Sequence, residues 1–194
     1  MNNQKIPFQG ERDLFVLLTG FGNGGIMGSL IEEWRVCWMV FREIKKTETG
    51  LLKRFLYEAI FIPEGVTPPE FKIVEQPELK IYYEGFGTGR ADYCIVAEDD
   101  GNVVGAVWTR IMNDYGHVDD DTPSFAISLL KEYRNQGIGT RLMKGMLELL
   151  REMGYEKASL AVQKANYAVR MYEKVGFKTV NENDDEYIMV YEFE

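Results

Sequence analysis

A short segment combines two glycines with the boundary between an apolar run and a long helix. The apolar run covers residues 125–130, the segment reads Tyr-Arg-Asn-Gln-Gly-Ile-Gly-Thr from Tyr133 to Thr140, and an amphipathic helix pattern continues to near Gly154. A strand that turns in this way into a helix points several backbone N–H groups in one direction, and the helix dipole adds positive potential there. Gly137 and Gly139 lack the Cβ atoms that would keep a diphosphate from the backbone. The pattern predicts a cradle for the pyrophosphate of a nucleotide-bearing cofactor; the alternative is a glycine-capped turn without a ligand.

The following part of the chain makes this pattern more specific. The segment is not a nucleotide-triphosphate loop, because no Gly-Lys-Ser/Thr follows its second glycine. Alternating apolar residues at 158, 160 and 162 predict a strand. Asn166 suits the N-cap of a further helix, Gly176 suits its C-terminal stop, and the helix ends in Tyr-Glu-Lys-Val-Gly-Phe from Tyr172 to Phe177.

This order of strand, Arg-x-x-Gly-x-Gly, long helix, strand and a helix ending in Tyr-Glu-Lys-x-Gly-Phe resembles the GNAT superfamily of acetyl-CoA-dependent N-acetyltransferases. The strongest match covers residues 124–193, and the elements from about residue 39 follow the family's order less specifically. The resemblance implies the acyl-CoA N-acyltransferase fold, which is a single α/β domain with a mixed, mostly antiparallel sheet and helices on both faces. It also implies acetyl-CoA as the co-substrate.

The resemblance further implies roles for individual residues. A pantetheine amide offers the same donors and acceptors as a peptide, so the strand segment would pair its backbone with the pantetheine arm; its residues are Ile127, Ser128 and Leu129. The pyrophosphate would be held by the glycine motif, Arg134, Asn135, Gln136, Gly137, Ile138, Gly139 and Thr140, although a solvated side chain is the alternative for its first member. Asn166 resembles a cofactor-contacting asparagine, but it lies six residues before Tyr172, where seven is more usual.

Acetyl transfer from a thioester to an amine needs a proton acceptor for the amine and a proton donor for the thiolate. Tyr172 matches the family's general acid, because a phenol with a pKa of about 10 keeps its proton at neutral pH. A packed core tyrosine is the alternative. The general base has no motif position; Asp119 and His117, in the polar loop 114–122, are candidate bases, and a water chain could replace them.

Composition excludes several classes of protein. A chain of 194 residues suits one domain, and a net charge of −9 argues against a nucleic-acid partner. Cys37, Cys94 and the single His117 fit neither a metal site nor a disulfide framework. With no secretion pattern and no apolar run of membrane-spanning length, a cytoplasmic protein without a membrane partner is expected.

The remaining elements must position these motifs. We predict strands over about 39–46, 91–98, 103–113, 177–182 and 186–193, and helices over about 48–61 and 77–86. The long helix should pack into the core with an apolar stripe of Ile138, Leu142, Met146, Leu149, Leu150 and Met153. Residues 1–38 are predicted to be an N-terminal appendage, either flexible or an over-extended start, before a transferase domain at 39–194.

The sequence therefore predicts a transferase that moves an acetyl group from acetyl-CoA to a primary amine by direct attack on the thioester. A non-catalytic acyl-CoA-binding module with a regulatory role and a transferase for another acyl group are the alternatives. The acceptor, a small molecule or a peptide, is not readable from the sequence, because acceptor loops follow no simple motif. The resemblance is compatible with a homodimer.

Overall fold

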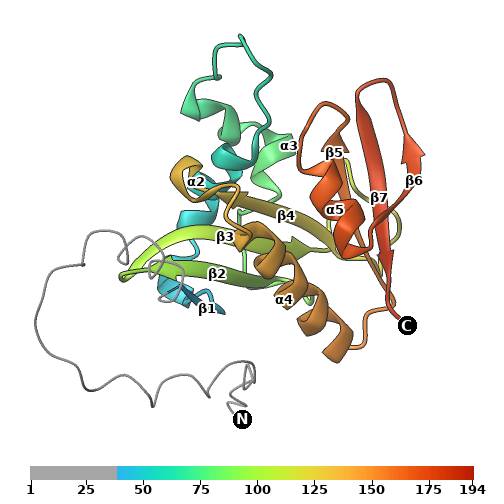
Figure 1. Ribbon diagram of the computed structural model, residues 1–194. Coiled ribbons are helices and arrows are strands. Elements are labelled where there is room, and N and C mark those ends of the chain that lie inside the picture. Colours follow the sequence, from blue (N-terminus) through green and yellow to red (C-terminus); the bar gives the residue numbers. More distant parts are fainter. Residues whose placement is uncertain (1–38) are drawn as a thin grey trace, which may run out of the picture. The chain divides into compact units, whose positions relative to one another are not determined.

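The computed structural model describes residues 39–194, and the predicted appendage at residues 1–38 lies outside them. Within the described part, a seven-stranded sheet has the order β1-β2-β3-β4-β5-β7-β6 (Figure 1). Its strands are β1 (Val40–Glu43), β2 (Tyr93–Asp99), β3 (Asn102–Arg110), β4 (Ser124–Leu129), β5 (Lys157–Gln163), β6 (Lys178–Glu182) and β7 (Glu186–Glu192). Neighbouring strands run antiparallel except for β4 and β5, which are parallel. The predicted mixed, mostly antiparallel sheet is confirmed.

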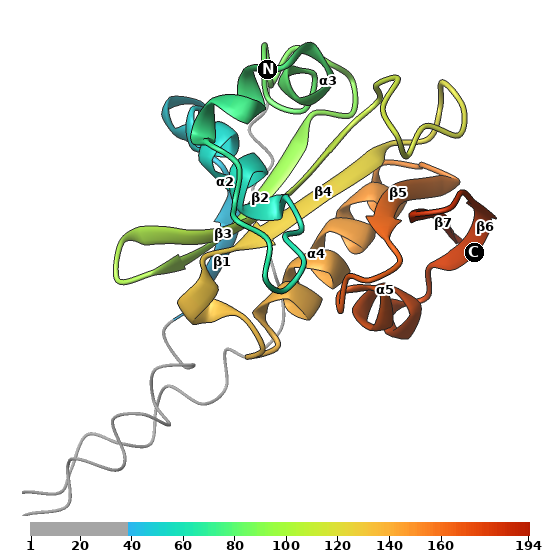
Figure 2. The same ribbon diagram turned by 90° about the horizontal axis from the view of Figure 1, so that it is seen from above.

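Helices cover both faces of this sheet. The α-helices are α2 (Leu51–Ala59), α3 (Pro77–Lys80), α4 (Ile138–Glu152) and α5 (Val169–Val175), and 3-10 helices cover η2 (Lys46–Glu48), η3 (Phe71–Glu75) and η4 (Lys131–Tyr133). Seen from above, α2 and α4 lie on opposite sides of the sheet (Figure 2). This confirms the predicted α/β fold with helices on both faces. Among residues 39–194, no helix is both long and apolar enough to cross a membrane.

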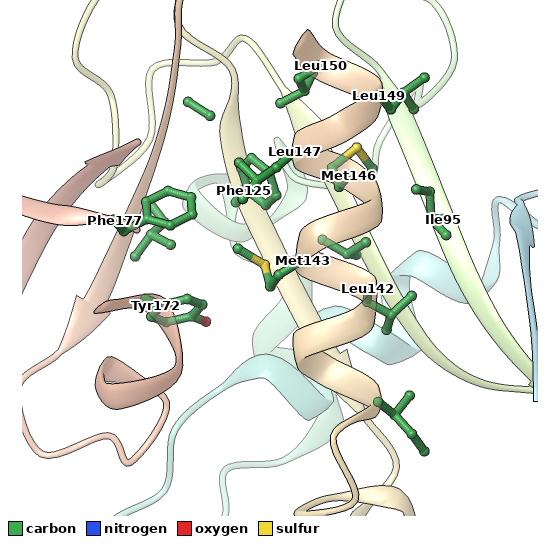
Figure 3. Packing of buried hydrophobic residues seen from close by; sticks show 14 of the residues in the cluster. Ile95, Phe125, Leu142, Met143, Met146, Leu147, Leu149, Leu150, Tyr172 and Phe177 are labelled. Atoms are coloured by element: carbon green, nitrogen blue, oxygen red, sulfur yellow. The ribbon is translucent and has the colours of Figure 1, made fainter. Parts of the chain in front are cut away.

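Alternation along the central strands builds two cores. Ile95 and Ala97 of β2 pack into the core under α4, whereas Cys94 and Val96 pack into the core under α2. Successive side chains of a strand point to opposite faces, so one strand serves both cores. Figure 3 shows the α4 core, where the helix lies against side chains of β2 and β4. The predicted apolar stripe of α4 is buried except for Met153, which is 49% exposed because it caps the helix rather than continuing it.

The helix predicted over residues 77–86 is much shorter in the structure. α3 ends at Lys80, and turns follow in which Gly85 (φ 63°) and Gly87 (φ 96°) adopt left-handed backbone conformations. The Asp92 carboxylate accepts a hydrogen bond from the Gly87 N–H at 2.8 Å. Left-handed glycines, with an acceptor for the freed N–H group, keep a regular helix from extending through residues 85–87.

β4 and β5 separate almost as soon as they meet. The register joins them at a single pair, Ser124 with Ser159, whereas β3 accompanies β4 from Ser124 to Leu129 on its other edge. Beyond the Ser124–Ser159 pair, the edge of β4 that faces β5 therefore has no strand partner. An unpaired strand edge offers backbone donors and acceptors to a ligand.

Candidate active site

The open edge of β4 exposes the peptide groups of alternate residues. The Leu130 N–H donates to the Val104 carbonyl at 2.9 Å, just beyond the last register pair of β4 with β3. The backbone N–H and C=O groups of the even-numbered residues of this segment therefore point toward β3. Odd-numbered residues must then turn their N–H and C=O groups toward the opposite edge. Two contacts agree with this alternation, because Pro123 O accepts from the Ser159 N–H at 2.9 Å and Leu129 O accepts from Arg134 Nε at 2.9 Å.

A cavity of about 580 Å³ lies along this edge. Its wall begins at the end of α2 and the loop that follows, crosses β4 and the start of α4, and reaches α5. Its lining includes ten of the predicted site residues: Ile127, Ser128, Leu129, Arg134, Asn135, Gly137, Gly139, Thr140, Asn166 and Tyr172. Segments far apart in the sequence thus meet at one hollow.

The start of α4 presents a row of unsatisfied backbone donors. In the described chain, the N–H groups from Asn135 through Thr140 donate to no protein acceptor, and the first bond of the helix is from the Arg141 N–H to Gly137 O at 3.1 Å. Asn135 (φ 62°) and Gly137 (φ 78°) are left-handed, which turns successive amides inward. A Cβ at Gly137 would extend into open space, whereas one at Gly139 would lie 3.4 Å from Met171 Sδ. The geometry is that of an anion cradle.

Arg134 is held by protein groups rather than by solvent. Its guanidinium donates to Leu129 O, to Glu58 O at 3.1 Å and to Glu58 Oε2 at 3.0 Å. The side chain thus ties the glycine motif to the end of α2 across β4. Its position at the cavity wall fits the sequence-based expectation of a role at the site, but its polar contacts make it first a brace for the cradle.

Two members of the motif keep their side chains away from the cavity. Ile138 is a buried residue of the α4 core, and Gln136 Nε2 donates to Glu132 O at 2.8 Å. Neither side chain lines the cavity, yet both N–H groups belong to the unsatisfied row. Ser128 likewise serves the fold with its hydroxyl, which donates to Phe55 O at 2.6 Å and fixes α2 on β4.

Tyr172 reaches the cavity from α5. The side chain is 8% exposed, and its ring packs edge-on against Phe177 at 6.1 Å between centroids. Burial raises the pKa of its phenol, with a smaller contribution from Tyr167, so the group stays protonated at neutral pH. A buried tyrosine hydroxyl usually finds a partner, but this one bonds to no residue of the described chain; it points from α5 toward α4 (Figure 3).

Asn166 caps a turn that precedes the helix. Its Oδ1 accepts from the Ala168 N–H at 2.9 Å, and α5 begins at Val169 rather than at Asn166. The predicted capping chemistry is therefore present, one turn earlier than the regular helix. Asn166 also lines the cavity, and its contact with a cofactor stays a prediction.

The two candidate bases lie elsewhere. Asp119 lines a second cavity of about 510 Å³ together with Arg90 and Lys157. A hydrogen bond from the Thr122 hydroxyl is the main reason that the pKa of Asp119 lies below its usual range. A lowered pKa disfavours a proton-accepting role. His117 Nδ1 lies 3.1 Å from Met112 O. Neither Asp119 nor His117 lines the first cavity.

Sequence reasoning did not identify one wall of the cavity. This wall comes from the end of α2 and the loop after it, with smaller additions from η4 and α5; its residues are Tyr57, Glu58, Ala59, Ile60, Phe61, Ile62, Pro68, Pro69, Lys131, Tyr167, Ala168 and Met171. The Pro68–Pro69 pair was a visible signal, but locally it indicates only a break in the chain.

Comparisons with known proteins agree with this geometry. The chain is 32% identical over 110 residues to an N-alpha-acetyltransferase of Sulfurisphaera tokodaii, covering 48% of this chain and 65% of that protein. It is 37% identical over 86 residues to a probable N-acetyltransferase camello of Xenopus tropicalis, covering 43% of this chain and 37% of that protein. The chain thus spans less than two thirds of the length of these curated relatives.

A solved structure extends the likeness to the whole fold. The PaiA N-acetyltransferase of Thermoplasma acidophilum, in complex with coenzyme A, superposes with a TM-score of 0.60 at 17% identity, covering 80% of this chain and 99% of that chain. At this identity the likeness shows the fold alone. Residues 60–177, which include the glycine motif, the open edge of β4 and Tyr172, match the acetyltransferase (GNAT) family, and the chain belongs to that family.

Proposed function

We propose that this protein transfers an acetyl group from acetyl-CoA to a primary amine by direct attack of the amine on the thioester. The observation that carries the proposal is that three features line one cavity: the amides of Asn135–Thr140, the open edge of β4, and the Tyr172 phenol. The relatives named above as N-acetyltransferases support the same reaction.

The residues present fit the parts of coenzyme A. The unsatisfied amides at the start of α4 would bind the pyrophosphate, and Gly137 leaves room for it to approach the backbone. The Ile127 peptide group and the Leu129 N–H would pair with the pantetheine amides as an added strand would. When bound, acetyl-CoA supplies an activated thioester; Tyr172 would hold the proton that the departing thiolate needs.

The charge around the cavity suits an anionic ligand, although the whole chain carries −9. Lys131 and Arg134 both belong to the wall. Among the described lining residues the only acid is Glu58, which is paired with Arg134 at 3.0 Å. The local field is therefore more positive than the average field of the chain. With Arg134 offset by Glu58, Lys131 leaves the lining a net positive charge, which favours an anionic cofactor arm.

The acceptor side of the cavity is apolar. Phe61, Ile62, Pro68 and Pro69 line it after α2, and no unpaired carboxylate stands among the described lining residues. A polycationic acceptor would find no counter-charge in this wall. We therefore place the α-amine of a peptide first among the acceptors, an assignment that the N-alpha-acetyltransferase of Sulfurisphaera tokodaii also favours.

An assay of thiol release tests the proposal. Purified protein and acetyl-CoA are incubated with a peptide that has a free N-terminus, with the same peptide N-terminally blocked, and with spermidine or free amino acids. We expect thiol release with the free peptide above the rate without acceptor. Heat of coenzyme A binding in calorimetry without transfer to any of these amines would instead favour a non-catalytic binding module, and competition by succinyl-CoA would report acyl selectivity.

A further inference from the structure

A half-satisfied carboxylate lies where β4 and β5 meet. Asp114, between β3 and β4, accepts hydrogen bonds at Oδ2 from the Tyr82 hydroxyl at 2.8 Å and from Ser124 Oγ at 2.7 Å. Its other oxygen, Oδ1, is buried and has no hydrogen-bond partner in residues 39–194. A buried acceptor without a donor is costly and needs an explanation.

A second buried oxygen without a partner lies beside it. Ser159 pairs with Ser124 in the single β4–β5 register pair, and Ser159 Oγ is the other buried side-chain atom that lacks a partner in the described chain. Its neighbours Ala158 and Leu160 pack into the α4 core, so by alternation Ser159 faces the α2 side. Both unsatisfied oxygens therefore flank the point where the open edge of β4 begins.

This centre lies across the sheet from Tyr172. Tyr172 packs in the α4 core, whereas Tyr82, which donates to Asp114, packs against the α2 core. Ser124 also faces the α2 side, because its neighbour Phe125 is in the α4 core. The open edge of β4 thus has a buried phenol on one face and a buried carboxylate on the other.

The position of the carboxylate is fixed by the core. Trp108 Nε1 donates to Tyr82 O at 3.0 Å, and Arg110 donates to Ile81 O at 2.8 Å, which hold the turn that carries the Tyr82 hydroxyl. The start of the β3–β4 loop is equally constrained, since a Cβ at Gly116 would lie 2.8 Å from Ser124 Oγ and 2.9 Å from a β5 backbone nitrogen.

We propose that Asp114 accepts the proton that the acceptor amine loses as it attacks. The inference rests on the proposed acetyl transfer. The amine forms the C–N bond and the C–S bond breaks; the N–H proton passes along a chain of waters to Asp114 Oδ1, and the thiolate takes the proton of Tyr172. Ser124 is three residues from Ile127, about 10 Å along the strand. A chain of waters joined by hydrogen bonds of about 2.8 Å each would bridge that span.

The surroundings of Asp114 suit a proton acceptor. Burial raises the pKa of its carboxyl above the usual value. The Ser124 and Tyr82 hydroxyls oppose that shift, and the backbone N–H groups of Asp114 and Gly116 oppose it to a smaller extent. A carboxylate with a raised pKa is a better base near neutral pH. The other titratable groups nearby are His117 on the same loop, and Tyr115 and Glu186, both of which raise the pKa of Tyr82.

Substitution of Asp114 by Asn tests the inference with an acceptor that the wild type uses. Asn keeps the size and one acceptor oxygen but cannot take a proton. We expect kcat to fall about 10²–10⁴-fold, with an unchanged Kd for coenzyme A by calorimetry, and the fall in activity on the acid side that belongs to Asp114 to disappear. Asp120→Asn, whose side chain is 99% exposed, is the matched control and should behave as wild type.

A second variant keeps the carboxylate and tests the same point. Tyr82→Phe removes a hydrogen bond that favours the charged form of Asp114, so the acid limb of the pH–rate profile should move to higher pH. If Asp114→Asn does not fold, this measurement takes its place as the test. Wild-type kcat in Asp114→Asn, or an unmoved limb in Tyr82→Phe, overturns the inference while thiol release by the wild type keeps the proposed function. Absence of thiol release by the wild type removes both.

Discussion

At the scale of the residue, Tyr172 combines near-complete burial with a hydroxyl that bonds to no residue of the described chain. We expect Tyr172→Phe to lower kcat about 10²–10⁴-fold, because the thiolate loses its proton donor. The melting temperature should hardly change, because the substitution breaks no hydrogen bond of the fold and keeps the ring packed on Phe177. Steady-state kinetics and thermal unfolding of the same preparation measure both quantities.

A matched phenol serves as the control for Tyr172. Tyr191 also packs its ring against Phe177, at 5.6 Å between centroids, but it does not line the cavity. Tyr191→Phe should therefore retain wild-type kcat. If Tyr172→Phe also retained it, Tyr172 would be a packing residue, and the proton would have to come from water.

At the scale of the element, the two ends of α4 offer a controlled comparison. Gly137 (φ 78°) precedes the helix and Gly154 (φ 81°) follows it, and a Cβ at either position would meet open space. Alanine at each should cost a similar 1–2 kcal/mol or so of folding free energy, since both backbones are left-handed. Only Gly137→Ala places a methyl group where the diphosphate would lie.

We therefore expect Gly137→Ala to weaken coenzyme A binding by roughly tenfold, which corresponds to about 1.4 kcal/mol, while Gly154→Ala leaves the Kd unchanged. Isothermal calorimetry with coenzyme A, beside denaturant unfolding of both variants, separates the two effects. Equal losses of affinity in both variants would mean that general destabilisation, not contact with the ligand, is responsible.

The elements also show what local patterns can and cannot predict. The glycine motif, α4 and β5 follow from periodicity and turn chemistry within the segment, and the structure has them where they are expected. The helix predicted over 77–86 is too long because Asp92, which lies beyond it, stabilises the turns at Gly85 and Gly87. Asp92 lies close to these turns in space, but its contact with them leaves no trace in the hydrophobic periodicity of residues 77–86.

Sequence patterns predict the cradle better than the rest of the site for a similar reason. The cradle consists of consecutive residues, so its spacing is visible in the sequence. The cavity wall after α2 and the surroundings of Asp114 join segments that are distant in the chain. Asp114 accepts from Tyr82 and Ser124, and Ser124 pairs with Ser159. The polar loop was expected to hold a base, but the position within it depends on which carboxylate the strand junction buries.

At the scale of the whole molecule, an ion cluster links the first strand to the sheet. Arg42 of β1 donates to Glu48 of η2 at 2.7 Å and, through Nε, to Glu98 of β2 at 2.7 Å. The hydrogen bond from the Arg42 guanidinium is the main reason that the pKa of Glu48 is lowered from 4.5 to about 2. Because the unfolded chain then binds a proton at higher pH than the folded one, this stabilisation is complete above about pH 4.5 and is lost as the pH falls toward 2.

The free energy of unfolding should therefore decrease between about pH 4.5 and pH 2, and Glu48→Gln should flatten part of that slope. Urea unfolding at a series of pH values measures it. Glu64→Gln is the control, because Glu64 is exposed and forms no ion pair within residues 39–194. An identical slope in Glu48→Gln and wild type would show that the cluster makes no pH-dependent contribution to folding.

The predicted boundary near residue 39 is a hypothesis about the molecule as a whole. Residues 39–194 contain a seven-stranded sheet, a core on each of its faces and the cavity described above. A chain of residues 39–194 should therefore unfold cooperatively with the melting temperature of the full chain, bind coenzyme A with the same Kd, and release thiol at the same rate. Equal binding with a lost rate would assign residues 1–38 to the acceptor side of the reaction, and a lost fold would make them part of the domain.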